Sequence, residues 1–295
     1  MPCYFPWTAY RGPDGRIVFQ DRGDPIQLPC GRCIGCRLER SRQWAVRIVH
    51  EMKMHDVSSF LTLTYDDHHL PDDLSLNKKH LQDFFKRLRS RGIKFRYFAC
   101  GEYGDDYSRP HYHVCLFGYN FVGDRKVCAK SGQFDLYQSK FLDDVWSHGA
   151  CRIGDLTFES AAYVSRYCVK VVNGDMAEAH YTRVSAETGE IYKLLPEFAL
   201  MSSKPGIGRM WLEKYWRDVY QASDSVISRG HEAKPPRYYD KMFRKYFSIY
   251  IDNRDGEIDY KRVLDSRSRC GDNTEERLAV RYKVALAGLK LKRRS

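Results

Sequence analysis

Two histidines and a glutamate are the first residues whose types and spacing suit chemistry. His111 and His113 lie two positions apart in an apolar, aromatic run over residues 111–119. In a β-strand, residues i and i+2 project from the same face, so the two imidazoles are expected to point together. Glu102 ends the preceding run of this kind, residues 94–102. An antiparallel register that pairs it with either histidine places their Cβ atoms ~5 Å apart.

This trio suits a divalent metal ion. Two imidazoles and one carboxylate leave coordination positions open, which is typical of a catalytic site and not of a closed structural one. Without the glutamate, two histidines at this spacing are more often packing or surface residues. A slip of the register by one residue would turn Glu102 to the opposite face, so the interpretation depends on how the two strands pair.

Tyr163, Tyr167 and Lys170 form the second group. They occupy positions i, i+4 and i+7 of a helical pattern over residues 159–172, so they share about one stripe beside an aliphatic one. A phenol has a pKa of ~10, so at neutral pH only about one in a thousand is ionised and able to attack. A nearby ammonium favours the phenolate, and a metal on a phosphate stabilises the crowded transition state. The alternative is an amphipathic core helix with boundary tyrosines, which has no need of the lysine.

Attack by a phenolate on a phosphodiester exchanges one phosphate ester for another. The exchange conserves the bond energy and therefore needs no nucleotide. Consistent with this, the sequence contains no G-x4-G-K-[ST] phosphate loop.

Cysteines form a third group. Of the ten in the chain, Cys30, Cys33 and Cys36 have C-x2-C-x2-C spacing, and Cys3 is the best candidate for a fourth ligand of Zn2+. Unliganded thiols in a turn are an equal alternative, and the lack of a downstream C-P signature disfavours an iron–sulfur cluster. The N-terminus has no secretory pattern, so free thiols or metal ligands are expected rather than disulfides.

Two segments carry weaker signals. The run Asp66–His69 follows a strand pattern, and such polar residues usually form a solvated loop and not a metal site. Gly206 and Gly208 precede a helical pattern and could admit a phosphate at the helix N-terminus. Both rank below the three groups above.

The elements that must position these groups alternate between helix and strand periodicity. Asn77 is expected to cap a helix closed by Gly92, and the runs 94–102 and 111–119 are expected to form a β-hairpin. Residues 120–158 have a mixed pattern. Further helices are expected at 37–54, 138–146, 159–172 and 210–220, and further strands at 59–65 and 151–153.

We predict an α+β fold, with a central antiparallel β-sheet that carries Glu102, His111 and His113 and the tyrosine helix packed across it. A length of 295 residues with 43% apolar residues supports one large domain or two. The composition divides the chain into an irregular Cys/Pro/Gly-rich N-terminal arm, a central domain and a basic, mainly helical C-terminal region, at residues 1–36, 37–220 and 221–295.

The charge favours an anionic partner. Forty-nine Lys and Arg against 38 Asp and Glu give a net charge of +11, and the 21 Tyr and 15 Phe suit base stacking, so single-stranded nucleic acid is the leading candidate. Residues 277–295 include basic side chains and no acidic ones. This composition is typical of a frayed solvated tail or of a segment that binds nucleic acid without sequence specificity. No run approaches the ~20 apolar residues of a membrane span, so no membrane partner is expected.

Three segments resemble, in order and spacing, motifs one, two and three of the HUH endonucleases: Phe60-Leu61-Thr62-Leu63-Thr64, Arg109-Pro110-His111-Tyr112-His113, and Tyr163-x3-Tyr167 with Lys170. More narrowly, the chain resembles the replication initiators of small icosahedral single-stranded DNA bacteriophages, the gokushovirus branch of the microviruses, whose paired tyrosines also lie one helical turn apart. Segments 29–37 and 205–208 resemble that branch too, and the match covers roughly residues 28–215. Tyr112 stands where the family has a hydrophobic residue, and Arg166 follows the first tyrosine by three positions.

This resemblance implies a site-specific endonuclease and ligase with an HUH fold. One tyrosine would attack the scissile phosphate of single-stranded DNA at the viral origin, become linked to the 5′ end and free a 3′-OH primer for rolling-circle synthesis. After one circuit the second tyrosine would cut the regenerated origin, and the released 3′-OH would close a unit-length circle. Either Tyr163 or Tyr167 suits the first attack.

The resemblance also implies a setting for this chemistry. The implied cofactor is Mg2+ or Mn2+ at Glu102, His111 and His113. The implied partners are origin DNA, a host helicase and a host DNA polymerase, and the implied location is the host bacterial cytoplasm.

Two alternatives stay open at this point. One is a noncatalytic single-stranded DNA-binding or packaging protein, in which charge and aromatic residues do everything and the histidine pair is structural. The other keeps the chemistry in a plasmid initiator, relaxase or transposase of the same superfamily. Helicase domains, which would argue for some of these, are not visible in the sequence.

Overall fold

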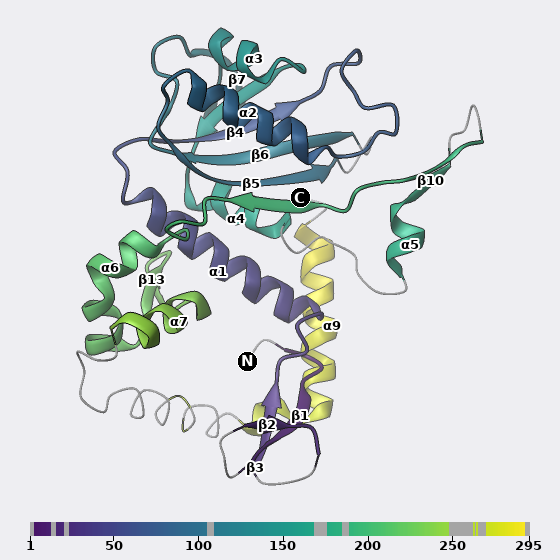
Figure 1. Cartoon of the computed structure of the whole chain (residues 1–295). Coiled ribbons are helices and arrows are strands. Elements are labelled where there is room, and N and C mark those ends of the chain that lie inside the picture. The colour runs from purple at the N-terminus through teal and green to yellow at the C-terminus, as the bar shows by residue number, and fades with distance from the viewer. Residues whose placement is uncertain are drawn as a thin grey trace. The chain divides into compact units, whose positions relative to one another are not determined.

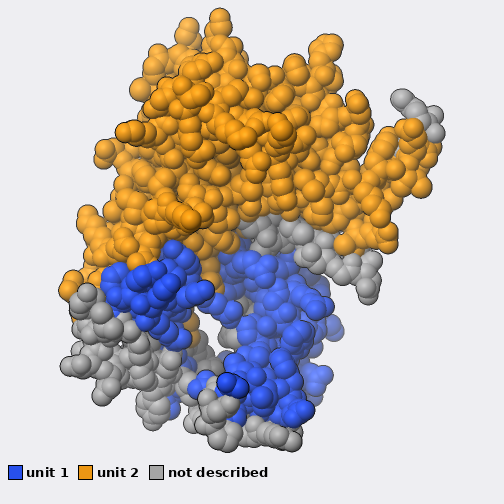
Figure 2. Space-filling view, in the orientation of Figure 1, with its two compact units in different colours: residues 1–42, 237–295 blue, residues 43–236 orange. Residues whose placement is uncertain are grey.

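The computed structural model describes residues 3–12, 16–20, 24–104, 109–167, 176–184, 189–247, 262, 264 and 270–292. The chain divides into two compact units, which Figure 2 colours separately: unit 1 combines residues 1–42 with 237–295, and unit 2 comprises residues 43–236. Unit 2 holds the central sheet, and unit 1 holds the N-terminal sheet and the last helices.

Unit 2 is built on a seven-stranded antiparallel sheet in the order β12-β5-β6-β4-β9-β8-β7 (Figure 1). The hairpin of β5 and β6 lies near its middle, with β4 on the other side of β6. The strands are β4 (Ser58–Thr64), β5 (Arg96–Tyr103), β6 (Pro110–Phe117), β7 (Lys126–Ser131), β8 (Phe134–Gln138), β9 (Cys151–Asp155) and β12 (Phe198–Met201). The predicted α+β fold, with a large antiparallel sheet flanked by helices, is confirmed.

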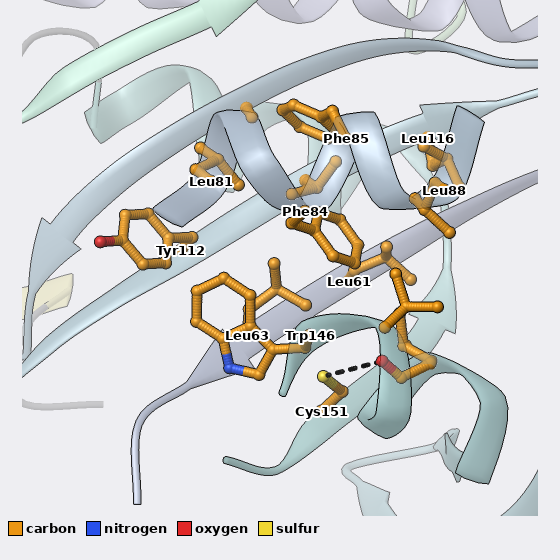
Figure 3. Packing of buried hydrophobic residues seen from close by; sticks show 14 of the residues in the cluster. Leu61, Leu63, Leu81, Phe84, Phe85, Leu88, Tyr112, Leu116, Trp146 and Cys151 are labelled. Carbon is orange, nitrogen blue, oxygen red and sulfur yellow. Dashed lines mark hydrogen bonds between the residues drawn. The ribbon is translucent and has the colours of Figure 1, made fainter. Parts of the chain in front are cut away.

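One face of the sheet packs against α2 (Lys78–Ser90) and α3 (Lys140–Trp146). Residues of β4 alternate between buried and half-buried, and the apolar residues of α2 recur at helical spacing, so each element offers one apolar side. Figure 3 shows part of the resulting cluster, whose members include Leu61, Leu63, Leu81, Phe84, Phe85, Leu88 and Trp146.

Helix α2 begins and ends as predicted. The side chain of Asn77 accepts hydrogen bonds from the backbone N–H groups of Lys79 at 2.9 Å and His80 at 3.3 Å. Gly92 follows the helix with a φ of +79°, a conformation that favours glycine.

The opposite face packs against α4 (Phe158–Tyr167) and the second half of α1 (Ile34–Met52), which Figure 1 shows on the side of the sheet away from α2. Because side chains alternate along β5 and β6, this face also carries Glu102, His111 and His113. The helix with the tyrosines and the candidate metal ligands therefore share one side of the sheet. The buried cluster on this face includes Ile48, Phe98, Cys100, Cys115, Phe117, Ala161 and Val164.

Two parts of the sheet escape the sequence pattern. β7 and β8 form a hairpin in the region that the sequence analysis leaves mixed, and every residue of β7 is exposed. β12 pairs with β5 at one edge of the sheet, and its four residues are only half-buried. The residues of β7 are exposed on both faces, and those of β12 pack partly against the clusters on both faces, so neither strand has an alternation to detect.

The rest of unit 2 is made of short elements. The helix expected at 210–220 is observed as α6 (Arg209–Arg217), continued by a π-helix (Asp218–Ser223). The other elements are α5 (Met176–Tyr181), β10 (Thr182–Val184), β11 (Ile191–Lys193), β13 (Val226–Ser228) and β14 (His231–Ala233).

The hairpin of β13 and β14 lies in the region predicted as mainly helical and is a local departure from that prediction. Arg229 and Gly230 both have positive φ, 54° and 76°, which is what a two-residue hairpin turn requires. Strands of three residues are too short to show alternation in the sequence.

Unit 1 contains a three-stranded antiparallel sheet in the order β2-β1-β3 where the composition predicts an irregular arm. The strands are β1 (Trp7–Arg11), β2 (Ile17–Val18) and β3 (Asp24–Leu28). The pattern misses them because Ala9 is the only buried residue among their described side chains. The helices of the unit include the start of α1, α7 (Arg237–Tyr246), a 3-10 helix (Cys270–Asn273) and α9 (Glu275–Lys292).

Among the helices in the described part of the chain, none is both long and apolar enough to span a membrane.

Candidate active site

The hairpin of β5 and β6 brings the three candidate metal ligands together. Glu102 pairs with His111 in the register of the two strands, so the predicted pairing is confirmed. Glu102 Oε1 lies 2.8 Å from Nε2 of His111 and 2.8 Å from Nε2 of His113. The three side chains thus place their ligand atoms within 4.8 Å of one another, as a shared cation requires.

Solvent reaches this group at His111. The side chains of Glu102 and His113 are 3% and 6% exposed, whereas that of His111 is 19% exposed. A ligand from solvent therefore reaches the group past His111. Water is largely excluded from the carboxylate, which strengthens its attraction for a cation.

The hydrogen bonds of His111 decide which ring nitrogen carries its proton. Its Nδ1 lies 3.1 Å from the backbone carbonyl oxygen of Arg109, and a carbonyl only accepts, so Nδ1 donates. In a neutral ring, Nε2 then points a lone pair at the Glu102 oxygen, and the two repel unless a cation or a second proton lies between them. The donor set therefore fits a divalent metal ion, with His113 held at Nδ1 by the Thr62 hydroxyl at 3.2 Å.

The carboxylate of Glu102 stays charged in this setting. Burial by itself raises the pKa of Glu102, but the imidazoles of His111 and His113 that face its Oε1 outweigh burial and hold the pKa below its ordinary value. An ionised carboxylate is the form that binds a metal ion.

Tyr163 lies against this group. Its ring meets that of His113 edge to face, with the ring centroids 5.1 Å apart, and meets Phe60 at 6.4 Å. The guanidinium of Arg166 lies 5.6 Å from the centre of the Tyr163 ring. Sequence reasoning noted Arg166 only by its position, and the structure shows that it contacts the tyrosine from the next turn of the helix.

Helix α4 is oriented by its own residues. Thr157 and Ser160 cap its start reciprocally, since the backbone N–H of each donates to the hydroxyl of the other at 2.8 and 3.3 Å. Ala161 and Val164 are fully buried and hold the helix on the sheet. Tyr167 is the last residue of α4, but its side chain lies outside the described residues. Lys170 also lies outside them.

Tyr112 occupies the position between the two histidines and faces the other side of the sheet. Its hydroxyl accepts from the N–H of Asn77 at 2.8 Å, donates to the Asn77 carbonyl at 3.0 Å and contacts the Tyr65 hydroxyl at 2.8 Å. A tyrosine therefore fits at this position of β6, because its polar end ties the strand to the cap of α2. Burial raises the pKa of Tyr112 to about 12, which disfavours its phenolate.

The glycines at 206 and 208 do not form the predicted phosphate site. The N–H of Gly208, which precedes α6, donates to Oε2 of Glu51 at 2.6 Å, and the N–H of Arg209 donates to the Gly206 carbonyl at 2.9 Å. The prediction is wrong because a carboxylate from α1 already takes the place of the anion. Arg96 also binds this carboxylate.

The Glu51 contact leads to a stability prediction. The side chain of Glu51 is fully buried; burial by itself raises its pKa, but hydrogen bonds from His55, Gly208 and Arg96 outweigh burial and lower it. We expect Glu51→Gln to cost about 3 kcal/mol at neutral pH, because Arg96 loses its charged partner. The stabilisation from the ionised group is fully present above the ordinary glutamate pKa of ~4.3 and is lost as pH falls through the lower folded value.

Denaturant unfolding of both proteins between neutral and acid pH measures this difference. The gap between wild type and Glu51→Gln should narrow as pH falls. Glu213→Gln, which removes the partner of Arg209 from a half-exposed pair, is the matched control and should lose much less. A gap that stays the same at every pH contradicts the assignment.

The run Asp66–His69 forms a loop whose charged groups pair with protein side chains. Asp66 accepts from the N–H of His69 at 2.9 Å, and Asp67 binds Arg109 at 2.7 Å. The second of these contacts involves Arg109, whose backbone carbonyl accepts the hydrogen bond from Nδ1 of His111. Sequence reasoning missed the contact of Asp67 with Arg109, because the two residues are 42 positions apart.

The structure also groups Cys3, Cys30, Cys33 and Cys36, whose sulfur atoms lie within 4.8 Å of one another. They belong to unit 1, whereas the Glu102 group belongs to unit 2.

Comparison with known proteins follows the same segments. Residues 58–172, from β4 to beyond α4, match the family described as replication-associated protein ORF2/G2P. The chain is 34% identical over 259 residues to replication-associated protein VP4 of Bdellovibrio phage phiMH2K, which covers 83% of this chain and 78% of the relative. It is 30% identical over 242 residues to replication-associated protein ORF2 of Spiroplasma virus 4, covering 76% and 71%. It is 28% identical over 251 residues to replication-associated protein ORF4 of Chlamydia phage 1, covering 81% and 58%. No solved structure matches the chain.

Proposed function

This chain belongs to the family of phage replication-associated proteins, and from that membership we propose that it is the initiator endonuclease of rolling-circle replication. It nicks single-stranded DNA at the viral origin by attack of a tyrosine, stays linked to the 5′ end and later rejoins the ends to release circular genomes. The observation that best supports this is the edge-to-face contact of Tyr163 with His113, because a nucleophile must lie beside the cation that activates its phosphate.

Each residue of the metal group has its own task. Glu102, His111 and His113 would hold a divalent cation, whose Lewis acidity would withdraw charge from the scissile phosphate. The Arg109 carbonyl keeps the proton of His111 on Nδ1, so its Nε2 stays available as a ligand. The Thr62 hydroxyl contacts Nδ1 of His113 and orients that ring.

The proposed chemistry balances without a nucleotide. In the nicking step, the hydroxyl of Tyr163 or Tyr167 loses its proton and its oxygen forms a bond to phosphorus, while the bond from phosphorus to the 3′ oxygen breaks and that oxygen takes up a proton. In the joining step, a 3′-OH loses its proton and forms the bond to the same phosphorus, and the tyrosine oxygen leaves and takes up a proton. The proposed role of Lys170, which is to favour the phenolate, rests on its position in the sequence.

The partners follow from the same proposal. Origin DNA is the substrate, a host helicase separates the strands, a host DNA polymerase extends the 3′-OH primer, and the reaction takes place in the cytoplasm of the host bacterium. Residues 37–220 form the nicking and joining domain, and the basic region 221–295 adds affinity for DNA that does not depend on sequence, in keeping with the net charge of +11.

A labelling experiment tests this function and its polarity. Single-stranded oligonucleotides that tile the genome encoding this chain are prepared with either a 5′ or a 3′ label and incubated with the protein and Mn2+. We expect labelled protein that survives denaturing electrophoresis only with the 3′ label, because the tyrosine keeps the 5′ end of the downstream fragment. A noncatalytic DNA-binding protein would bind the oligonucleotides without shortening any of them. Labelled protein obtained with the 5′ label would mean that the tyrosine is linked to the 3′ end of the upstream fragment, which contradicts the proposed polarity.

The choice of metal gives a further prediction. Two of the three ligand atoms are imidazole nitrogens, and Mg2+ prefers oxygen ligands more strongly than Mn2+ does. We expect half-maximal nicking at an Mn2+ concentration about tenfold lower than that of Mg2+. Titration of each metal into metal-free protein measures the ratio. Equal or better activation by Mg2+ contradicts this ligand set.

A further inference from the structure

The four cysteines of unit 1 lie at distances that suit a shared metal ion. All four sulfur atoms are within 4.8 Å of one another, and Cys3 Sγ lies 3.9 Å from Cys33 Sγ. Sulfurs at the corners of a tetrahedron with metal–sulfur bonds of ~2.3 Å are ~3.8 Å apart. A disulfide requires ~2.05 Å, so the spacing fits metal ligands and does not fit disulfides.

The sheet of unit 1 explains how distant cysteines meet. β1 pairs with β3 in a register that sets Trp7 opposite Leu28. Cys3 precedes Trp7 by four residues and Cys30 follows Leu28 by two, so antiparallel pairing returns one to the other. Cys33 and Cys36 lie on either side of Ile34, where α1 begins. They are about one helical turn apart, so both sulfur atoms lie near those of Cys3 and Cys30.

Backbone groups around the sulfurs favour their charged form. The N–H of Cys30 donates to Cys3 Sγ at 3.2 Å, that of Cys33 to Cys30 Sγ at 3.3 Å, and that of Tyr4 to Cys33 Sγ at 3.4 Å. Hydrogen bonds from N–H groups to sulfur stabilise a thiolate, which is the form that binds metal. Neutral thiols packed in an apolar core are weak acceptors and do not require three N–H donors.

The surroundings also call for a covalent or metal link. Of the described side chains in β1, β2 and β3, only Ala9 is buried, while Trp7 and Ile17 are each 49% exposed. A sheet with so small a core gains little from hydrophobic burial. Small folds of this kind are commonly held by a structural metal ion.

We propose that Cys3, Cys30, Cys33 and Cys36 bind one Zn2+ as a closed structural site, separate from the Glu102 group. Four thiolates exclude Mg2+ and Mn2+, which prefer oxygen ligands, and leave no position open for a substrate. On binding, each thiol releases its proton to solvent. The ion closes the loop from Cys3 to Cys36 and fastens the N-terminal sheet to the start of α1.

Metal analysis of the full-length wild-type protein is the first test. We expect about one zinc per chain after purification, retained during dialysis against EDTA at a concentration that strips Mn2+, and released by a mercurial reagent that attacks thiolates. Protein refolded with Co2+ instead should show the visible bands of a tetrahedral ion and a charge-transfer band from thiolate. Both measurements use the wild-type sequence, so a folding defect in a variant cannot affect them.

Variants then locate the ion. Cys33→Ser should lower the zinc content to less than about a fifth of the wild-type value, because one ligand is removed from a closed site. Cys128→Ser, which changes an exposed cysteine outside the group, is the matched control and should leave the zinc content unchanged. His111→Ala should also leave it unchanged, so loss of zinc and loss of nicking are independent results.

Three results would overturn the proposal. The first is wild-type protein without zinc whose four thiols all react freely or form disulfides. The second is iron with acid-labile sulfide, which would identify a cluster. The third is zinc that remains in Cys33→Ser but is lost in His111→Ala.

Discussion

Replacing both Tyr163 and Tyr167 by phenylalanine is expected to abolish the covalent protein–DNA adduct, with a loss of at least about 1,000-fold in the rate of nicking. The change removes only the two hydroxyls that we propose attack phosphorus. The ring of Tyr163 keeps its contacts with His113 and Phe60, so the fold and the binding of single-stranded DNA should be retained. Denaturing electrophoresis measures the adduct, and fluorescence anisotropy with the same oligonucleotide measures binding.

The single variants assign the order of attack. Whichever tyrosine acts in the first step, its phenylalanine variant should lose nicking of the intact origin, while the other variant should still nick and fail to complete the second transfer. Tyr112→Phe is the matched control from the same motif. Its hydroxyl lies on the opposite face in the network with Asn77, so we expect a loss of about 1–2 kcal/mol in stability and an unchanged adduct per folded molecule. An adduct that persists in the double variant would remove the tyrosine mechanism.

Glu102→Gln is expected to lower nicking at a fixed, low Mn2+ concentration by at least about 100-fold, the second large effect. The substitution keeps the shape of the side chain but removes the charge that both imidazoles face. The Mn2+ concentration for half-maximal activity should rise by more than about tenfold, since even an outer partner of a metal ligand has an effect of that size. DNA binding measured without metal should not change.

A purely structural role for Glu102 gives a different outcome. The variant would then unfold more easily, but its nicking per folded molecule would keep the wild-type dependence on Mn2+. Adding Mn2+ in excess should restore part of the activity of Glu102→Gln and none of the activity of the double phenylalanine variant. Rescue of both, or of neither, contradicts the assignment of Glu102 as a metal ligand.

The hairpin of β5 and β6 shows which part of the candidate metal group could be predicted from the sequence. Alternation in residues 111–113 is a local property, so it already places both histidines on one face and Tyr112 on the other. The partner of His111 is not local, because the segment that joins β5 to β6 leaves the register open. Packing of the whole sheet, with β12 and β4 on the outer sides of this hairpin, selects the register that brings Glu102 to His111.

Other features could not be predicted from the local sequence, because they depend on contacts with distant parts of the chain. The Gly208 turn resembles a phosphate site until Glu51, 157 positions away, is seen to bind its N–H. β12 has no pattern of its own and exists as a strand because β5 offers it an edge.

By itself, the amino-acid sequence determined the types of chemistry available: two imidazoles on one strand face, two phenols on one helical stripe and three cysteines in one turn. These groups each lie within a single strand, helix or turn. There, the spacing between residues fixes the face on which their side chains lie. Only the tertiary structure decided which groups meet, namely Glu102 and Tyr163 with the histidine pair and Cys3 with the other cysteines. Such meetings depend on strand register and on the packing of helices against the sheet, and these are set by burial over the whole fold.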